Sequence, residues 1–173
     1  MIRQANENDI LKIAKTYDEL LIYEKENENH SNWQLGIYPT IKVPELRVPL
    51  GEMYVLENEN NEICASMILN QVQAKEYSTI PWKYLADDNN LLVIHTLCIP
   101  PQEAGKGYGT KMINYAKDFA KDLNYPVIRI DTYAYNEPAK SLYQKNGFRI
   151  AGYATSLLEG LIPEEQAYLE FKF

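Results

Sequence analysis

The sequence predicts an α/β (α+β) fold: a mixed, mostly antiparallel twisted sheet of six to seven strands, with a central parallel β-α-β unit and helices on both faces. Two observations support this prediction. A hairpin comes first in the order of strand-like and helical segments, and a strand-helix-strand unit follows. One central segment is almost entirely apolar, which is typical of a strand buried on both faces. The 173 residues suffice for a sizeable core, so we expect a single domain over residues 1–173.

Local patterns assign the elements in order. Apolar residues at helical spacing, capping residues and prolines define the helices, while alternation and polar turns define the strands. The first half is expected to contain an edge strand at 1–4, a helix from Ile10 capped by Asn8 or Asp9, an irregular proline-containing segment at 30–50, and a hairpin of strands 52–57 and 62–71. The second half is expected to contain a connection at 72–90, a buried strand at 91–99, a helix at 108–123, a strand at 127–133, a short helix at 136–146, and strands at 148–155 and 167–173.

Composition excludes several classes of protein. Apolar residues make up 46% and charged residues 24%, as in ordinary globular chains. No apolar run approaches the roughly 20 residues of a membrane span, and the first residues lack the apolar segment of a signal peptide. Two cysteines, Cys64 and Cys98, are too few for a disulfide framework or a metal cluster. We therefore expect a soluble, cytoplasmic protein without a metal and without a membrane partner.

The net charge of −7 argues against nucleic acid as a partner, because an acidic chain is a poor counterion for phosphate. The same charge mildly favours cationic partners through electrostatic steering. The sequence leaves a homodimer open.

A glycine-rich loop, residues 99–109, leaves the apolar strand and enters the next helix. Its alternating glycines let successive backbone N–H groups point inward, and the helix start adds unpaired donors and a partial positive charge. This pattern predicts an anion site, most naturally for phosphate. The order Thr110-Lys111 does not match a P-loop, and the threonine does not match a dinucleotide fingerprint. A tight turn without a ligand is the alternative interpretation.

A second segment, residues 136–148, lies one strand later. Asn136 suits a helix N-cap, and Pro138 suits the first turn. Tyr143 follows Asn136 by almost two helical turns, so the two residues share one face of the helix.

With both segments, the chain resembles the GCN5-related N-acetyltransferase (GNAT) family, specifically over residues 91–153 and loosely over the whole order of elements. The resemblance implies the acyl-CoA N-acyltransferase fold and acetyl-CoA as cosubstrate. It also implies that Asn136 approaches the cofactor and that Tyr143 lies near its sulfur. The backbone residues implied at the pantetheine arm are Leu97, Cys98 and Ile99. The loop residues implied at the pyrophosphate are Gly105, Lys106, Gly107, Tyr108, Gly109 and Thr110.

One position departs from the family pattern. The family loop usually has Arg or Gln three residues before its middle glycine, whereas this chain has Ala104. Gln102 or Lys106 would have to replace that side-chain donor. Backbone contacts survive the change, so we retain the cofactor and expect a lower affinity.

Acetyl transfer to an amine needs a base, oxyanion donors and an acid. Tyr143 is our expected acid, and packing against the sheet is its alternative role. Backbone N–H groups near Leu97 and Cys98, exposed at a β-bulge, are the expected oxyanion donors. His95 is the candidate base, directly or through water, because it interrupts an apolar strand and titrates in a suitable range. A core histidine is the alternative.

Other residues have weaker claims to a role in the chemistry. An acyl-cysteine on Cys98 is disfavoured because free cysteines are commonly buried. Arg129 and Asp131, two residues apart on one strand face, are expected to pair with each other. The aromatic residues Trp33, Tyr38 and Trp82 are candidate substrate walls, with loop anchoring as the alternative.

The sequence thus predicts an acetyl-CoA-dependent N-acetyltransferase that acts by direct transfer in a ternary complex. The expected acceptor is a small-molecule or peptide amine. A non-catalytic acyl-CoA binding or sensing module is the main alternative, and a nucleotide-binding domain without acyl chemistry is a weaker one.

Overall fold

The computed structural model describes residues 1–173, and its seven-stranded sheet has the strand order β1-β2-β3-β4-β5-β7-β6. The strands are β1 (Ile2–Gln4), β2 (Met53–Glu57), β3 (Ile63–Asn70), β4 (Leu91–Cys98), β5 (Val127–Tyr133), β6 (Arg149–Leu158) and β7 (Ile162–Lys172). The helices are α1 (Ile10–Glu26), α2 (Lys42–Arg47), α3 (Tyr108–Asp122) and α4 (Glu137–Lys145). β4 pairs with β5 in parallel, while β1 with β2, β2 with β3, β5 with β7 and β6 with β7 pair antiparallel. The predicted mixed sheet with a parallel β-α-β unit is confirmed.

The chain forms two compact units. The first consists of residues 1–29, 33–69 and 96–115, and the second of residues 30–32, 70–95 and 116–173. Strand β4 and helix α3 each contribute residues to both units.

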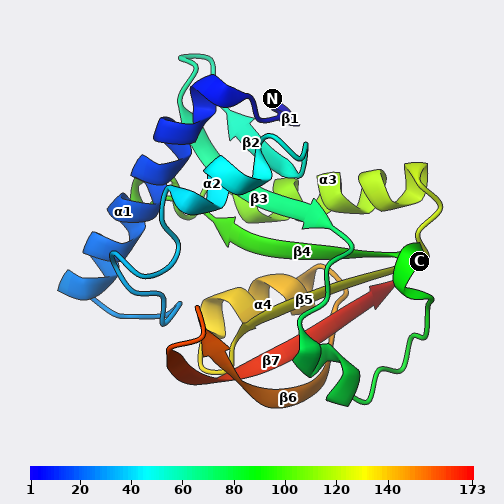
Figure 1. Cartoon of the computed structure of the whole chain (residues 1–173). Coiled ribbons are helices and arrows are strands. Elements are labelled where there is room, and N and C mark those ends of the chain that lie inside the picture. Colours follow the sequence, from blue (N-terminus) through cyan, green and yellow to red (C-terminus); the bar gives the residue numbers. More distant parts are fainter. The chain divides into compact units, whose positions relative to one another are not determined.

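Alternation along β2 places helices on both faces of the sheet in the first unit. Met53 and Val55 are fully buried in a cluster with Ile13 of α1. Between them, Tyr54 points to the opposite face, where its ring lies 5.6 Å from that of Tyr115 on α3. Figure 1 shows α1 and α2 beside β2 and β3.

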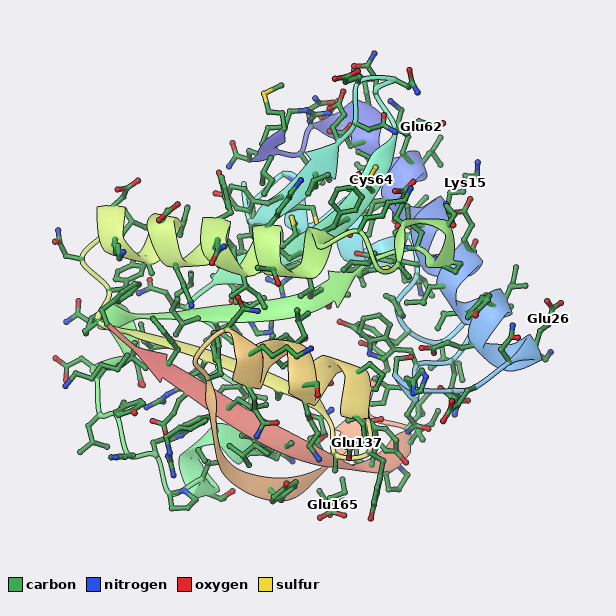
Figure 2. The ribbon with its side chains drawn as sticks, turned by 180° about the vertical axis from the view of Figure 1, so that it is seen from behind. Lys15, Glu26, Glu62, Cys64, Glu137 and Glu165 are labelled. Atoms are coloured by element: carbon green, nitrogen blue, oxygen red, sulfur yellow. The ribbon has the colours of Figure 1, made fainter.

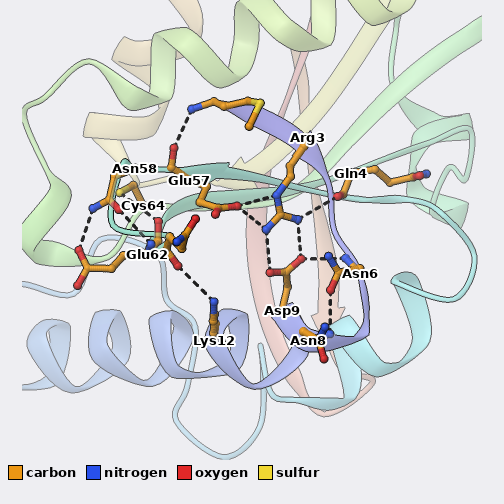
Figure 3. Close-up of polar contacts among 12 residues, drawn as sticks. Arg3, Gln4, Asn6, Asn8, Asp9, Lys12, Glu57, Asn58, Glu62 and Cys64 are labelled. Carbon is orange, nitrogen blue, oxygen red and sulfur yellow. Dashed lines mark hydrogen bonds and ion pairs between the residues drawn. The ribbon is translucent and has the colours of Figure 1, made fainter.

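An arginine ties the first strand to the start of α1 (Figure 3). Arg3 donates to both oxygens of Asp9 at 2.7 and 3.0 Å, and its Nε donates to Glu57 at 2.6 Å. Bonding to Arg3 lowers the pKa of the buried Asp9 carboxyl.

The predicted N-cap of α1 is wrong in detail, because neither Asn8 nor Asp9 caps this helix through its side chain. Asn6 caps a preceding 3-10 turn instead.

In the second unit, β6, β7 and β5 lie side by side with α4 beside them (Figure 1). One face is covered by α4 and the end of α3, where the Phe148 and Phe171 rings lie 5.4 Å apart and Lys117 lies 4.2 Å from the Phe171 ring centroid. The other face is covered by the segment 72–90, through Tyr77 and Trp82 against Tyr168.

The last two strands are longer than the sequence predicts. β6 continues to Leu158, and β7 begins at Ile162 rather than at residue 167. These extensions pair with each other through their backbones, and Leu157 within them remains 53% exposed. The segment 30–50 contains the helix α2, which has only six residues. This agrees with the prediction that the prolines of this segment exclude one continuous helix.

No helix of the chain combines the length and the apolar character needed to cross a membrane.

Candidate active site

The glycine loop has the backbone that its sequence predicts. Gly105 and Gly107 have φ angles of 76° and 78°, in the left-handed region that favours glycine. Apart from atoms of the adjoining residues, no heavy atom lies within 4 Å of the position that a Cβ would take at either residue. Because α3 begins at Tyr108, its first-turn N–H groups lack helical acceptors. The loop thus leaves open space next to backbone donors.

The two side chains that could replace the missing loop donor are both bound to acids. Gln102 donates to Glu19 of α1 at 2.8 Å, and Lys106 donates to Glu103 at 2.9 Å. The bond to Glu103 raises the pKa of Lys106. Lys106 is exposed while Glu103 is half-buried, and a pair that is open to solvent on one side contributes little. Recognition by this loop would therefore depend mainly on its backbone.

Of the remaining loop residues, Gly109 is buried and Thr110 is exposed. Tyr108 is half-buried, and Lys111 Nζ lies 5.2 Å from its ring centroid.

Strand β4 is interrupted close to its end. Thr96 has a φ of 49°, an uncommon value for a threonine within a strand. The parallel pairing of β4 with β5 ends at Ile94 and Ile130. Such a break changes the direction of neighbouring backbone groups, as at a β-bulge. It lies directly before Leu97, where the sequence predicts exposed N–H donors.

Two of the predicted aromatic walls lie beside this break in the first unit. The hydroxyl groups of Tyr38 and Thr96 share a short hydrogen bond. The Trp33 ring stands edge-on to Tyr38, with centroids 6.1 Å apart, and packs against the core beneath α1. The structure thus brings Trp33, Tyr38 and Thr96 together.

Cys98 has the environment of a core residue. Its side chain is fully buried, and Sγ contacts the Thr16 carbonyl at 4.0 Å. Burial raises the pKa of Cys98 to about 12, so the nucleophilic thiolate is scarce at neutral pH. This environment agrees with rejecting an acyl-cysteine. Its neighbours Leu97 and Ile99 are half-buried.

Helix α4 positions Tyr143 in the second unit. Asn136 caps the helix, as predicted, by accepting from the Ala139 N–H at 3.2 Å. Tyr143 is 5% exposed, and its hydroxyl forms no hydrogen bond. Burial and the charge of Asp131 raise the pKa of Tyr143, so the phenol holds its proton at neutral pH.

His95 is half-buried on β4 and forms a hydrogen bond of 2.7 Å between its Nε2 and Asn70 Oδ1. Because an amide oxygen accepts, Nε2 donates in this arrangement. The bond holds the ring against Asn70 at the end of β3, and the role of His95 as base stays a prediction.

Trp82, the third predicted wall, has extensive contacts within the second unit. Its indole N–H donates to the Tyr77 carbonyl at 2.8 Å, and the Arg129 guanidinium lies 4.1 Å from its ring centroid. Its ring also stands edge-on to Tyr168 at 6.4 Å. These contacts favour the alternative role of a loop anchor.

The expected pairing of Arg129 with Asp131 is wrong. Arg129 donates to Gln73 at 2.6 Å and to the Tyr84 carbonyl at 3.2 Å, and it stacks on Trp82. Asp131 accepts instead from the Tyr77 hydroxyl at 2.6 Å. The partners of Arg129 and of Asp131 all come from the segment 72–90. Sequence alone could not place this segment on the face of β5 that carries the two residues.

Asp131 is the polar residue that the sequence interpretation missed as a functional candidate. Burial raises its pKa to about 6, and perturbed carboxyl groups are concentrated at functional sites. An acidic residue close to the end of a central strand was the only signal available in the sequence.

Comparison with known proteins gives a consistent result. The chain matches the model of the acetyltransferase (GNAT) family over residues 13–148. It is 29% identical to a streptothricin acetyltransferase of Escherichia coli over 107 residues, which cover 60% of this chain and 58% of that protein. A streptothricin acetyltransferase of Streptomyces lavendulae is 29% identical over 44% of this chain and 40% of its own length. The chain thus spans about half the length of these relatives.

A solved acetyltransferase of the GNAT family from Listeria monocytogenes has the same fold. It superposes with a TM-score of 0.75 at 21% identity, over 100% of this chain and 94% of that one. A phosphinothricin acetyltransferase from Sinorhizobium meliloti, solved with acetyl-CoA, superposes with a TM-score of 0.72 at 13% identity, over 100% and 88%.

Proposed function

The chain belongs to the acetyltransferase (GNAT) family, and from this we propose that it transfers an acetyl group from acetyl-CoA to a primary amine, by direct attack in a ternary complex. The observation that carries the proposal is the strand break at Thr96, followed by the open glycine turn that starts α3. The extent of the family match supports it.

The loop fits a pyrophosphate. Two positive-φ glycines leave room for a ligand, and the first turn of α3 supplies N–H donors together with the partial charge of a helix start. The proposed pyrophosphate contacts are Gly105, Lys106, Gly107, Tyr108, Gly109 and Thr110. Leu97, Cys98 and Ile99 would pair through their backbone with the pantetheine arm, and Asn136 would approach the cofactor from the start of α4.

Acetyl-CoA would supply an acetyl group activated as a thioester. His95 would remove a proton from the acceptor ammonium, directly or through water. Backbone N–H groups near Leu97 would donate to the oxygen that becomes negative during attack. Tyr143 would give its proton to the departing thiolate, a role supported by its unpartnered hydroxyl.

We assign a small-molecule amine as the acceptor, with a peptide amine as the second class. Similarity to streptothricin acetyltransferases supports the first class. Trp33 and Tyr38 would form part of the acceptor wall, because they lie beside the break in β4. Trp82 is a weaker candidate, since its ring is held by Arg129 and Tyr168.

We also propose a cytoplasmic location, since both cysteines are unpaired and buried. A homodimer is part of the proposal, and sedimentation equilibrium tests it.

Thiol release from acetyl-CoA tests the function. The purified chain is mixed with acetyl-CoA and a panel of amines that includes streptothricin, simple alkylamines, diamines and lysine peptides. We expect amine-dependent release of free thiol with at least one acceptor. Binding of acetyl-CoA without release for any amine would favour a non-catalytic acyl-CoA sensing module instead.

A further inference from the structure

Strand β6 forms one edge of the seven-stranded sheet, since it pairs with β7 alone (Figure 1). Beyond this ladder, no hydrogen bond reaches the backbone of residues 152–156. The N–H and C=O groups on the outer side of the strand are therefore free to pair with another strand. An edge of this kind is a template for a second chain.

Two common protections of an edge strand are absent from β6. Residues 150–158 include no charged side chain and no proline. The other edge of the sheet differs, because β1 has only three residues and its central Arg3 forms ion pairs with Asp9 and Glu57. Short length and a charged side chain both discourage pairing between edges. The chain thus protects one edge of its sheet and leaves the other available.

Apolar side chains are exposed along the available edge. Tyr153 is 49% and Leu157 is 53% exposed, and Thr155 between them is exposed as well. Since successive side chains of a strand alternate, these three point to the same face of the sheet. The face is the one beside α4, because Lys140 Nζ of that helix lies 6.0 Å from the Tyr153 ring centroid.

The regular part of β6 is symmetric about Thr155. The ladder with β7 shifts its register once, before Gly152, and then runs without interruption over residues 152–158, of which Thr155 is the centre. A second copy of the strand, related by a two-fold axis at Thr155, lies antiparallel and places Tyr153 of each copy opposite Leu157 of the other. The two threonines meet at the axis. Tyrosine and leucine then bury apolar area against each other, and threonine pairs are favourable across strands.

Charges do not oppose this pairing. Arg149, the one charged residue of β6, is already paired with Glu170. The charged residue of β7 opposite Thr155 is Glu165, which is exposed and labelled in Figure 2. Two copies of Glu165 would be three strand spacings apart, or about 14 Å at roughly 4.8 Å per strand. Their repulsion is screened, because the Debye length at physiological salt is about 8 Å.

We propose that β6 pairs antiparallel with β6 of a second copy of this chain, about a two-fold axis at Thr155. This inference rests on the homodimer included in the function proposed above and names its surface. A second copy is the occupant that the edge favours, because the exposed row is complementary to itself: each apolar side chain meets its partner at the symmetric position. The groups assigned to acetyl transfer lie outside β6, so the two proposals are tested separately.

Sedimentation equilibrium of charge variants tests the surface and its register together. Tyr153→Lys combined with Leu157→Lys places lysine opposite lysine at two positions, and should raise the dimer dissociation constant at least about 10-fold. Tyr153→Glu combined with Leu157→Lys removes the same apolar side chains but places glutamate opposite lysine. This variant should dimerise at least about 10-fold more tightly than the double-lysine variant, and high salt should reduce the difference.

A matched control carries the same substitutions on another element. Tyr23→Lys combined with Leu11→Lys changes one tyrosine and one leucine of α1, which are 50% and 73% exposed. This control should dimerise as the wild type does. Circular dichroism checks that every variant is folded.

A cross-link locates the axis while keeping the apolar contacts. Thr155→Cys places a thiol beside its own copy, since directly opposite residues have Cβ atoms about 4.5–5.5 Å apart. A short bismaleimide reagent should convert this variant into a covalent dimer on a denaturing gel. Both native cysteines are buried, so the wild type should stay unlinked. Leu11→Cys, with its thiol exposed on α1, should also stay unlinked.

The outcomes separate the proposals. A chain that sediments as a monomer at every concentration overturns the surface and the homodimer, while thiol release still reports on the transferase alone. A dimer that tolerates the double-lysine variant, or that Thr155→Cys does not cross-link, overturns the surface and leaves the homodimer standing. Dissociation by two lysines without recovery in the glutamate–lysine variant overturns the axis at Thr155. Dissociation, recovery and cross-linking together support the proposal.

Discussion

The hydroxyl of Tyr77 donates a hydrogen bond of 2.6 Å to Asp131 Oδ2, and this bond joins residues 54 positions apart. It connects the segment 72–90 to the central strand β5. The bond orients a carboxylate for which the fold supplies no basic partner. Its consequences can be measured in stability.

Asp131→Asn should make the protein more stable at neutral and alkaline pH. The pKa of Asp131 is about 6 in the folded protein, above its ordinary 3.8. The unfolded chain therefore releases this proton first, and stability falls as the pH rises from about 4 to about 6. The variant lacks that loss and should gain about 1–2 kcal/mol at pH 8, a value reduced for partial exposure. Urea unfolding between pH 4 and 8 measures the difference.

The charged groups that act on Asp131, Glu164 and Glu76, remain in both proteins. Glu165→Gln should follow the wild-type profile. A variant less stable than wild type at pH 8 would identify Asp131 as an ordinary structural carboxylate.

Gly107→Val should weaken coenzyme A binding by about 10-fold or more, whereas Lys106→Ala should change it little. Gly107 has a φ of 78°, so valine distorts the backbone that donates to the pyrophosphate. Lys106 is exposed and already paired with Glu103. Calorimetry with coenzyme A compares the two variants.

Gly160→Val is the control for backbone strain, because Gly160 also has a positive φ, of 68°, with nothing near its Cβ position. It should lower stability but leave binding intact. A larger loss for Lys106→Ala than for Gly107→Val would contradict recognition by the backbone.

Tyr143→Phe should lower kcat about 10²-fold or more while KM for the cofactor stays the same, because the hydroxyl acts only on the departing thiolate. The hydroxyl has no hydrogen-bond partner, so the melting temperature should stay close to that of wild type. Steady-state rates and thermal unfolding measure both effects. Tyr153→Phe, at a tyrosine that is 49% exposed, is the control. Normal turnover combined with a lower melting temperature would show a packing tyrosine.

His95→Gln should flatten the acidic limb of the pH–rate profile, because a base must be unprotonated to accept the amine proton. Glutamine can still bond Asn70, so the orientation of β4 against β3 is preserved. Rates from pH 5.5 to 9, at saturating substrates, measure the limb. His30→Gln, at the other histidine, should leave the profile unchanged. An unaltered limb at full rate in His95→Gln would return His95 to a packing role.

Sequence predicted the local features of this protein well, because each is encoded over a short stretch. The hairpin follows from alternation around a polar turn, and the capping of α4 by Asn136 follows from the chemistry of one side chain. Gly105 and Gly107 adopt the left-handed backbone that their spacing implies. Family membership follows from such stretches in combination.

The partners of charged side chains were decided by tertiary structure. Arg129 and Asp131 are two residues apart on β5, and the sequence predicts that they pair. In the folded chain Arg129 bonds Gln73 and stacks on Trp82, while Asp131 bonds Tyr77. The segment 72–90, which contains the 3-10 helix Lys75–Thr79, brings these partners to β5 from more than 40 positions away in the sequence. Periodicity reports which face a residue occupies, but only the path of the intervening chain determines what covers that face.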